Sequence, residues 1–185
     1  GTNAPNIYDI PASVTVECDA IPAVSTAPFA NDNCDDDVAI TFAEVRVDGS
    51  CEDSYTLTRT WTATDNCGNT DSGIQIITVK DTTDPILVGV PAAETVECSV
   101  VPVPAQPTAT DNCEVDITID FQEVKTDGNC TGNYTLTRTW IATDNCGNTD
   151  VEVQVITVQN TTDPELFGVP SDATVECDAI PPPAI

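Results

Sequence analysis

The stretch YTLTRTWTATDNCGNTD at residues 55–71 returns almost unchanged as YTLTRTWIATDNCGNTD at residues 134–150. A segment that recurs after a long interval is the signature of a repeat array. A second motif, VEC, ends at Cys18, Cys98 and Cys177 and has a similar interval. We therefore expect two repeats, at residues 1–83 and 84–162, and the first strand region of a third repeat at residues 163–185.

Apolar residues alternate with polar ones inside each repeat, and this period of two is typical of β-strands. Threonines line one face of residues 55–64, and the other face is mostly apolar, with Tyr55, Leu57, Trp61 and Ala63. The alternation reverses its phase within residues 38–47, which predicts a β-bulge near Ala43 and Glu44. We expect an all-β fold, with a sandwich of about five to seven strands in each repeat.

The chain contains nine cysteines and no CxxC motif, which predicts disulfides and an oxidising, extracellular environment. A domain of about 80 residues buries only about 60–65% of its unfolded surface, so covalent staples would contribute much of its stability. Each full repeat has four cysteines in the same order. Cys177 would belong to the third repeat, with its partner outside this sequence.

The order of the strands suggests a pairing for these cysteines. If each long segment crosses the sandwich once, the first and third cysteines of a repeat lie at one end, and the second and fourth lie at the other. Cys51 and Cys67 bracket a strand of about ten residues, or about 33 Å, which is too long for a disulfide between them. We therefore predict four bonds within the repeats: Cys18–Cys51, Cys34–Cys67, Cys98–Cys130 and Cys113–Cys146.

The same crossings predict the arrangement of the repeats. An odd number of crossings makes each repeat begin at one end and finish at the other, so that the repeats form an end-to-end rod. The joints between repeats are short, with DTTDP at residues 81–85 and NTTDP at residues 160–164. Because proline restricts the backbone, we expect these joints to be semi-rigid.

The balance of charges excludes several partners. The chain has 31 acidic and five basic residues, with a formal net charge of −26. Phosphate backbones and anionic lipid surfaces would be repelled, so we expect no nucleic-acid partner. No apolar run is long enough to span a bilayer, so we expect no membrane insertion of this segment. We expect the chain to be an internal segment of a longer extracellular protein.

Catalysis is not expected. The sequence has no histidine, which is the most common general base. It also lacks catalytic motifs such as GxSxG and HExxH. Acidic residues that recur in each repeat are explained more simply by the structure of the unit.

The rod would place both DNC turns of the second repeat at the preceding joint. This would gather eight oxygen-bearing side chains: Asp81, Asp84, Asp111, Asn112, Glu114, Asp144, Asn145 and Asn148. Calcium prefers six to eight oxygen ligands, so the pattern predicts calcium as a cofactor at the joint. The alternative is structural, because Asp and Asn before Gly form turns and their charges can be solvated. The sequence leaves both interpretations open.

Three features of the central strand have more than one interpretation. The threonine row of residues 56–64 could bind ice, but threonine also favours strands and stabilises solvent-facing surfaces. Trp61 and Trp140 could stack on sugars, although their alternation predicts core positions. Arg59 and Arg138 share the apolar face, so we expect them to reach its edge or stack on an aromatic ring.

The segment TWTATDNCGNTDSGIQIITVKDTTDP at residues 60–85 resembles the end of hyalin-repeat (HYR) domains. With TVECDAIP, the DNC pairs and YTLTRTW, the unit is similar to the tandem repeats of giant Bacteroidota cell-surface adhesins, including those of gliding motility. HYR domains often carry a cysteine after GNT. Because Ser72 and Val151 stand there in this chain, the disulfide pattern of those domains is not transferred.

This resemblance implies Ig-like sandwiches, export by the type 9 secretion system and a role at the cell surface. Asp81, Thr82 and Thr83 also resemble the O-glycosylation motif of that phylum, which makes Thr82 a candidate glycan site. Asn160 replaces Asp81 at the next joint, so this motif is lost there and one potential calcium ligand is weakened.

We therefore predict a structural repeat segment, a stalk or filament of a secreted adhesin, with neighbouring repeats of the same chain as its partners. Its task would be to provide reach and stiffness. The alternative function is a multivalent carbohydrate-binding module, in which each repeat binds a surface polysaccharide weakly.

Overall fold

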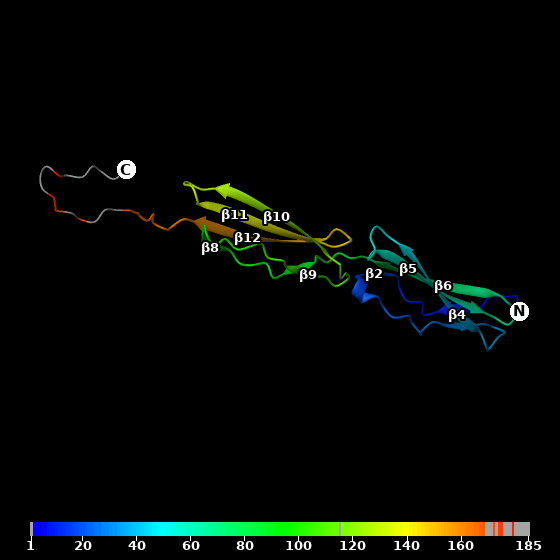
Figure 1. Ribbon diagram of the computed structural model, residues 1–185. Helices are drawn as coiled ribbons and strands as arrows, with labels where there is room; N and C mark the ends of the chain where they lie inside the picture. Colours follow the sequence, from blue (N-terminus) through cyan, green and yellow to red (C-terminus); the bar gives the residue numbers. More distant parts are fainter. Residues whose placement is uncertain (1, 115, 169–171, 173, 176–178, 180–185) are drawn as a thin grey trace.

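The protein is a rod of two β-rich repeats that follow each other end to end (Figure 1). The computed structural model describes residues 2–114, 116–168, 172, 174–175 and 179. Most of the predicted third repeat, including Cys177, lies outside the described residues. Among the described residues, no helix has the length and hydropathy needed to cross a bilayer.

Each repeat contains the same succession of strands. The first repeat comprises β1 (Asn6–Tyr8), β2 (Val14–Val16), a 3₁₀ turn η1 (Cys18–Ala20), β3 (Phe29–Asn31), β4 (Ala39–Asp48), β5 (Tyr55–Thr64) and β6 (Thr70–Val79). The second repeat comprises β7 (Ile86–Val88), β8 (Glu94–Glu97), β9 (Thr108–Thr110), β10 (Thr118–Asp127), β11 (Tyr134–Thr143) and β12 (Thr149–Gln159).

The strands of each repeat form a four-stranded sheet and a two-stranded sheet. The larger sheet has the order β2-β6-β5-β4 in the first repeat and β8-β12-β11-β10 in the second. Its short first strand is parallel to its neighbour, and the other pairs are antiparallel. The smaller sheets are β1-β3 and β7-β9. This arrangement confirms the predicted all-β, sandwich-like repeats.

The core lies on the inner face of β5 and β6, and of their counterparts β11 and β12. Leu57 packs with Ile77 and Val79, and these three side chains are buried. Trp61 is also buried and contacts Phe42 of the neighbouring strand, with ring centroids 5.2 Å apart. The alternation read from residues 55–64 therefore places its apolar side chains as predicted.

The predicted β-bulge is absent from β4. Its ten residues pair one to one with β5, from Ala39 opposite Thr64 to Asp48 opposite Tyr55. The apolar phase reverses because β4 is an edge strand whose residues are exposed on both faces. Phe42 faces inward beside Trp61, and Val45 points to the outer face without a kink in the backbone.

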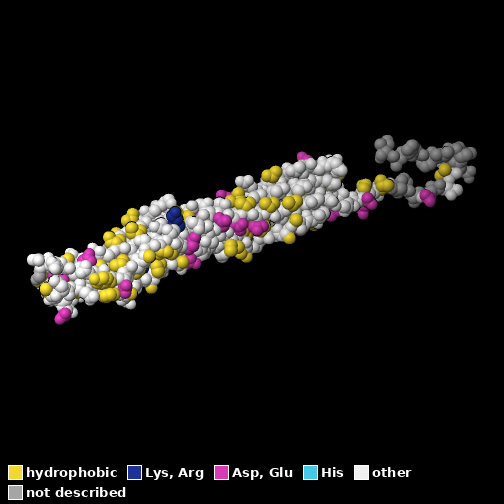
Figure 2. Space-filling model, turned by 180° about the vertical axis from the view of Figure 1, so that it is seen from behind, with side chains coloured by type: hydrophobic (Ala, Val, Ile, Leu, Met, Phe, Trp, Pro, Cys, Tyr) yellow, Lys and Arg dark blue, Asp and Glu magenta, His cyan; other side chains and the backbone are white. Residues whose placement is uncertain are grey.

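The outer face of the large sheet in the first repeat carries few charges. Val45, Val47, Ile74 and Ile76 are exposed there and flank the threonines of β5. Figure 2 shows hydrophobic side chains along both repeats, with acidic side chains gathered near the middle of the rod.

Arg59 is buried, and the prediction that it reaches the sheet edge or stacks on a ring is wrong. Its Nε donates to Glu44 Oε2 at 2.6 Å, and its Nη1 donates to the Pro22 carbonyl at 2.8 Å. Arg138 makes the corresponding bonds in the second repeat. Because the segment before β3 has no strand partner, its carbonyl groups need a donor, and the arginine supplies one.

Candidate functional site at the joint between the repeats

Two disulfides cross the joint between the repeats. Cys18 bonds to Cys113 and Cys51 bonds to Cys146, with Cα–Cα distances of 5.8 and 5.1 Å. Each bond spans 95 residues of sequence. In each bond, an end-facing cysteine of the first repeat meets a DNC turn of the second. The joint is therefore closed covalently at two points.

The predicted bonds Cys18–Cys51 and Cys113–Cys146 are wrong. Each of these cysteines lies at the end of its repeat that the strand crossings predict, but the repeat is not a closed unit. Cys18 and Cys51 both face the second repeat, and each finds its partner across the joint. The order of the strand crossings is compatible both with a disulfide inside one repeat and with a disulfide between two repeats that meet end to end.

The other two predicted bonds are also not formed. Cys34, Cys98 and Cys130 carry exposed free thiols, so neither Cys34–Cys67 nor Cys98–Cys130 is present in the structure. Cys34 and Cys67 nevertheless line one small cavity, at the end of the first repeat away from the joint. That placement agrees with the predicted position of the second and fourth cysteines.

Three carboxylates converge beside these disulfides. Asp81 follows β6, Asp111 follows β9 and Asp144 follows β11, and one oxygen of each lies within 4.8 Å of the others. Asp81 and Asp144 are only 6% and 7% exposed, and Asp111 is half-buried. The joint segment thus brings a carboxylate of its own to the two turns of the second repeat.

The surrounding turns satisfy only some of these oxygens. Asp144 Oδ1 accepts from the backbone nitrogens of Cys146 at 2.8 Å and Asn148 at 2.9 Å. Asp111 Oδ1 accepts from the backbone nitrogen of Cys113 at 2.8 Å. The Oδ2 atoms of Asp81 and Asp111 are buried and have no hydrogen-bond partner. Buried polar atoms without partners are rare in proteins, and they indicate a missing ion or water.

The pKa of Asp81 is raised from 3.8 to about 6, chiefly by burial and also by the nearby charges of Asp111, Asp144 and Glu17, against a backbone hydrogen bond from Thr83. Burial and the neighbouring negative charges both disfavour the ionised form of Asp81. Either a proton or a cation would relieve the repulsion.

The cluster fits a calcium ion in donor type and in size. Calcium binds oxygen at about 2.3–2.6 Å, so two ligands on opposite sides of the ion lie about 4.6–5.2 Å apart. The oxygens of Asp81, Asp111 and Asp144 fall within that span. Those three side chains would hold the ion, and it would supply positive charge where their charges meet.

The structural interpretation of the turns is also supported. Comparison with the first repeat shows which features belong to the turns and which belong to the candidate calcium site. Asp65 is the counterpart of Asp144, and the amide of Asn69 lowers the pKa of its carboxyl group. The turn hydrogen bonds are therefore present in both repeats. Gly1 stands where the second repeat has Asp81, since Pro5 and Cys18 align with Pro85 and Cys98. Among the described residues, three carboxylates converge this closely at the joint alone.

The remaining predicted ligands lie around this cluster or apart from it. Asn148 donates its amide to Asp144 Oδ2 at 2.7 Å, so its nitrogen faces the cluster. Asp84 is exposed and accepts from the Thr149 backbone nitrogen at 3.3 Å. The last three are placed differently. Asn112 lies beside Cys18. The backbone nitrogen of Asn145 donates to Glu114 Oε2, and the Asn145 side-chain amide donates to Asp53 Oδ2.

Glu17 belongs to the joint and was missed from the sequence. Its carboxylate accepts from the backbone nitrogen and the hydroxyl of Thr82, and it lies near Asp81 and Cys113. The repeated VEC motif could have indicated this residue, because Glu17 immediately precedes Cys18 in it. Thr82, the candidate glycan site, is exposed, and its hydroxyl already donates to Glu17.

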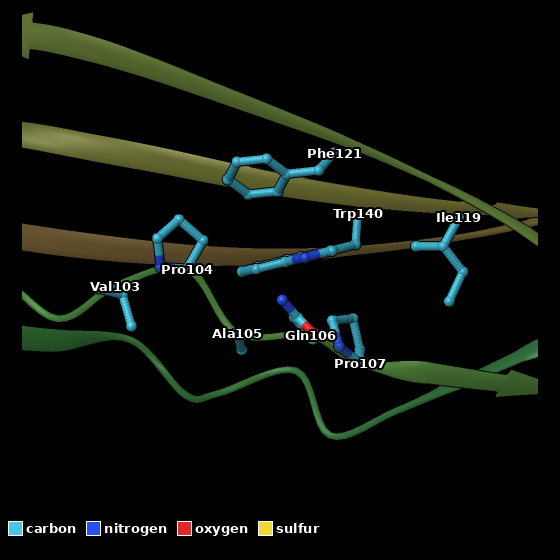
Figure 3. Close-up of a pocket in the computed structure, with 8 residues that line it drawn as sticks. All are labelled: Val103, Pro104, Ala105, Gln106, Pro107, Ile119, Phe121 and Trp140. Carbon is cyan, nitrogen blue, oxygen red and sulfur yellow. The ribbon is translucent and has the colours of Figure 1, made fainter.

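A groove in the second repeat bears on the carbohydrate alternative. Its volume is about 580 Å³, and Figure 3 shows Phe121, Pro104, Pro107 and Gln106 around the ring of Trp140. Trp140 is only 2% exposed, so its ring serves the core. The lining is apolar apart from Gln106, whereas sugar recognition needs several convergent polar groups. The groove therefore gives the carbohydrate interpretation no support.

A family model for an HYR-like domain with 4 cysteines matches the chain twice, at residues 6–79 and 86–158. No curated protein matches the sequence. Similar solved structures include N-cadherin EC1-4 of Drosophila, with 13% identity and a TM-score of 0.37. That match covers 86% of this chain and 50% of the cadherin fragment, so the chain spans about half of that fragment's length.

Two further solved structures are similar at the same level. The Ig1-2 module of the Drosophila receptor protein tyrosine phosphatase DLAR has 13% identity and a TM-score of 0.29, covering 85% of this chain and 100% of that one. Mouse cadherin-23 EC22-24 has 14% identity and a TM-score of 0.34, covering 85% and 67%. TM-scores this low carry no argument about function.

Proposed function

Since the chain belongs to the family of HYR-like domains with four cysteines, we propose that it is a structural stalk segment of a secreted cell-surface adhesin. Its work is mechanical: it extends the parent protein from the surface and resists bending at the joints. The observation that carries this proposal is the pair of disulfides across the joint.

Two bonds hold the joint more firmly than one. A single link between two bodies leaves a pivot, whereas Cys18–Cys113 and Cys51–Cys146 anchor two separate loops of the first repeat. Tandem repeats in extracellular proteins commonly behave as a chain of units whose stability depends on neighbouring interfaces. Here those interfaces are covalent, which suits a stalk under load in an oxidising medium.

Calcium is the second element of the proposal. The ion would bind Asp81, Asp111 and Asp144 and would join the segment that leaves the first repeat to both turns of the second. A stalk with this site would stiffen when calcium is present and would relax when calcium is removed. The convergence of three carboxylates, with the Oδ2 atoms of Asp81 and Asp111 buried and unpartnered, supports this role.

The finer assignments rest on the resemblance of the repeated motifs. We propose that the chain is exported by the type 9 secretion system. Its parent would be one of the giant Bacteroidota adhesins, a class that includes the adhesins of gliding motility. We also propose Thr82 as a glycan site. Mass spectrometry of the native protein tests the glycan, because an attached sugar adds a discrete mass to the peptide that contains Thr82.

Small-angle X-ray scattering tests the stalk itself. We expect the oxidised chain with calcium to give the maximum dimension of a straight rod. Addition of a chelator should broaden the distance distribution, and reduction of the disulfides should broaden it further. A distribution that is unchanged by both treatments would contradict the proposed role of the joint.

A further inference from the structure

The disulfides at the joint follow a rule that extends to both ends of the chain. The first and third cysteines of one repeat bond to the second and fourth cysteines of the next, through Cys18–Cys113 and Cys51–Cys146. The second repeat has its own first and third cysteines, Cys98 and Cys130, and both are exposed free thiols.

The local structure around Cys130 matches that around Cys51. In the first repeat, Gly49 N donates to the Ser54 carbonyl at 2.7 Å, and Ser54 N donates to the Cys51 carbonyl at 3.2 Å. In the second repeat, Gly128 N and Asn133 N make the same two bonds, at 2.8 and 3.1 Å. Cys98 follows β8 as Cys18 follows β2. Both thiols are thus presented in the geometry that supports a disulfide at the first joint.

The segment that leaves the second repeat also starts along the same path. Thr82 donates its backbone nitrogen and hydroxyl to Glu17, and Thr161 makes the same pair of bonds to Glu97. This anchor is independent of the cysteines. A repeat attached through residues 160–164 would therefore begin from the same position, relative to Cys98 and Cys130, as the second repeat does relative to Cys18 and Cys51.

The opposite end presents the complementary half. Cys34 lies in a DNC turn whose backbone nitrogen donates to Asp32 Oδ1 at 2.8 Å, and Cys113 makes the same bond to Asp111. The thiol of Cys34 is exposed and free. The two ends therefore differ and match each other, which is the property of a head-to-tail interface that extends without closing.

We propose that Cys98 and Cys130 form a covalent docking site for a following repeat of the same kind, so that every joint is closed by two disulfides. Cys98 would bond to the second cysteine of that repeat, and Cys130 to the fourth. This inference deepens the proposed stalk role, but it does not depend on calcium. The two disulfides would also compensate for contacts that the second joint lacks. Asn160 replaces Asp81 there and removes one carboxylate, and Gly132 replaces Asp53, which accepts from Asn145 at the first joint.

Each bond requires an oxidant, and a small-molecule disulfide such as oxidised glutathione supplies it. One thiolate attacks the glutathione disulfide and releases one glutathione thiol. The second protein thiolate then attacks the mixed disulfide and releases the other. Two protein thiols and one glutathione disulfide become one protein disulfide and two glutathione thiols.

A chain with a third full repeat tests the proposal. Residues 1–162 are followed by a second copy of residues 84–185, and Thr131→Ser in the added copy gives its peptide of residues 126–138 a distinct mass. The chain is oxidised with oxidised glutathione, digested with trypsin and mapped without reduction. We expect the peptide of residues 126–138 to be joined to the added copy's counterpart of residues 139–185, with Cys98 and Cys130 no longer alkylated.

The first joint is the internal control for folding, because its two disulfides must appear in the same digest. A Cys98→Ser, Cys130→Ser variant should keep those bonds and lose both bonds of the second joint. A Cys98–Cys130 bond, or two thiols that stay reactive while the first joint is oxidised, would overturn the proposal. Neither result would touch the calcium site, which is tested separately.

Discussion

Replacement of Asp111 by asparagine should have opposite effects with and without calcium. The substitution removes one charge from the cluster and keeps an oxygen that can accept from the Cys113 backbone nitrogen. Without calcium, the variant loses a like charge beside Asp81, so it should be at least as stable as the native chain. With calcium, it loses a charged ligand, so it should be less stable.

Two free energies set the size of the expected calcium effect: the cost of ionising the Asp81 carboxyl group, and the stabilisation by a bound ligand. The Asp81 pKa of about 6, against 3.8 for the ordinary group, corresponds to about 3 kcal/mol of unfavourable burial and repulsion near neutral pH. A ligand present at 100 times its Kd stabilises the folded state by about 2.7 kcal/mol. For a chain of this size, that free energy corresponds to a rise in Tm of about 5–10 °C.

Thermal unfolding followed by circular dichroism at pH 7 measures this rise, with millimolar calcium in one sample and a chelator in the other. The matched control is Asp32→Asn, because Asp32 makes the same turn hydrogen bond at the open end of the first repeat. Its calcium response should equal that of the native chain. Asp111→Asn should lose most of the response.

The reasoning is refuted if calcium raises the Tm of Asp111→Asn as much as that of the native chain. It is also refuted if Asp32→Asn loses as much of the calcium response as Asp111→Asn. Isothermal titration with calcium chloride provides a check that is independent of stability, and it should show at least a tenfold loss of affinity for Asp111→Asn alone.

Three further predictions concern pH, the disulfides and the core. The raised pKa of Asp81 means that the folded state binds a proton more tightly, so in chelator the free energy of unfolding should fall as the pH rises from about 4 to 6, and Asp81→Asn should flatten this dependence in urea titrations. The Cys51→Ser, Cys146→Ser double variant opens a loop of 95 residues, and it should lower stability by at most about 4–5 kcal/mol in denaturant unfolding, because the other disulfide still constrains the unfolded chain. Arg138→Ala removes a buried cation and should cost about 3–5 kcal/mol, whereas Arg46→Ala, at an exposed ion pair, should cost less than about 1 kcal/mol by the same assay.

The strands and the rod were accessible from the sequence because both follow from local patterns. The alternation in residues 55–64 identified the buried face of β5, including Trp61. The order of the crossings placed Cys18 and Cys51 at one end of the repeat. These inferences need only the period of a strand and the direction of the chain.

The pairing of the cysteines required information that a single repeat does not contain. Cys18 has two acceptable partners at its end of the repeat, Cys51 beside it and Cys113 across the joint. Only the packing of the two repeats selects between them. The same limit applies to Glu17, whose role depends on where Thr82 lies after the joint.

The cluster of acids was predicted too broadly for a related reason. Sequence placed eight oxygen-bearing residues near the joint, and the structure brings together three, Asp81, Asp111 and Asp144. Neighbours in sequence point in different directions, so Asn112 lies beside Cys18 while Asp111 enters the cluster. Arg59 was misjudged because the need of the Pro22 carbonyl for a donor appears only in three dimensions.

Peptide mapping of the oxidised chain without reduction tests the covalent joint. Trypsin cleaves after the five basic residues, Arg46, Arg59, Lys80, Lys125 and Arg138, and it places Cys18, Cys51, Cys113 and Cys146 in four different peptides. The structure predicts residues 47–59 joined to residues 139–185, and residues 1–46 joined to residues 81–125. Residues 1–46 joined to residues 47–59 would show that Cys51 is bonded within the first repeat and would contradict a joint closed by two disulfides.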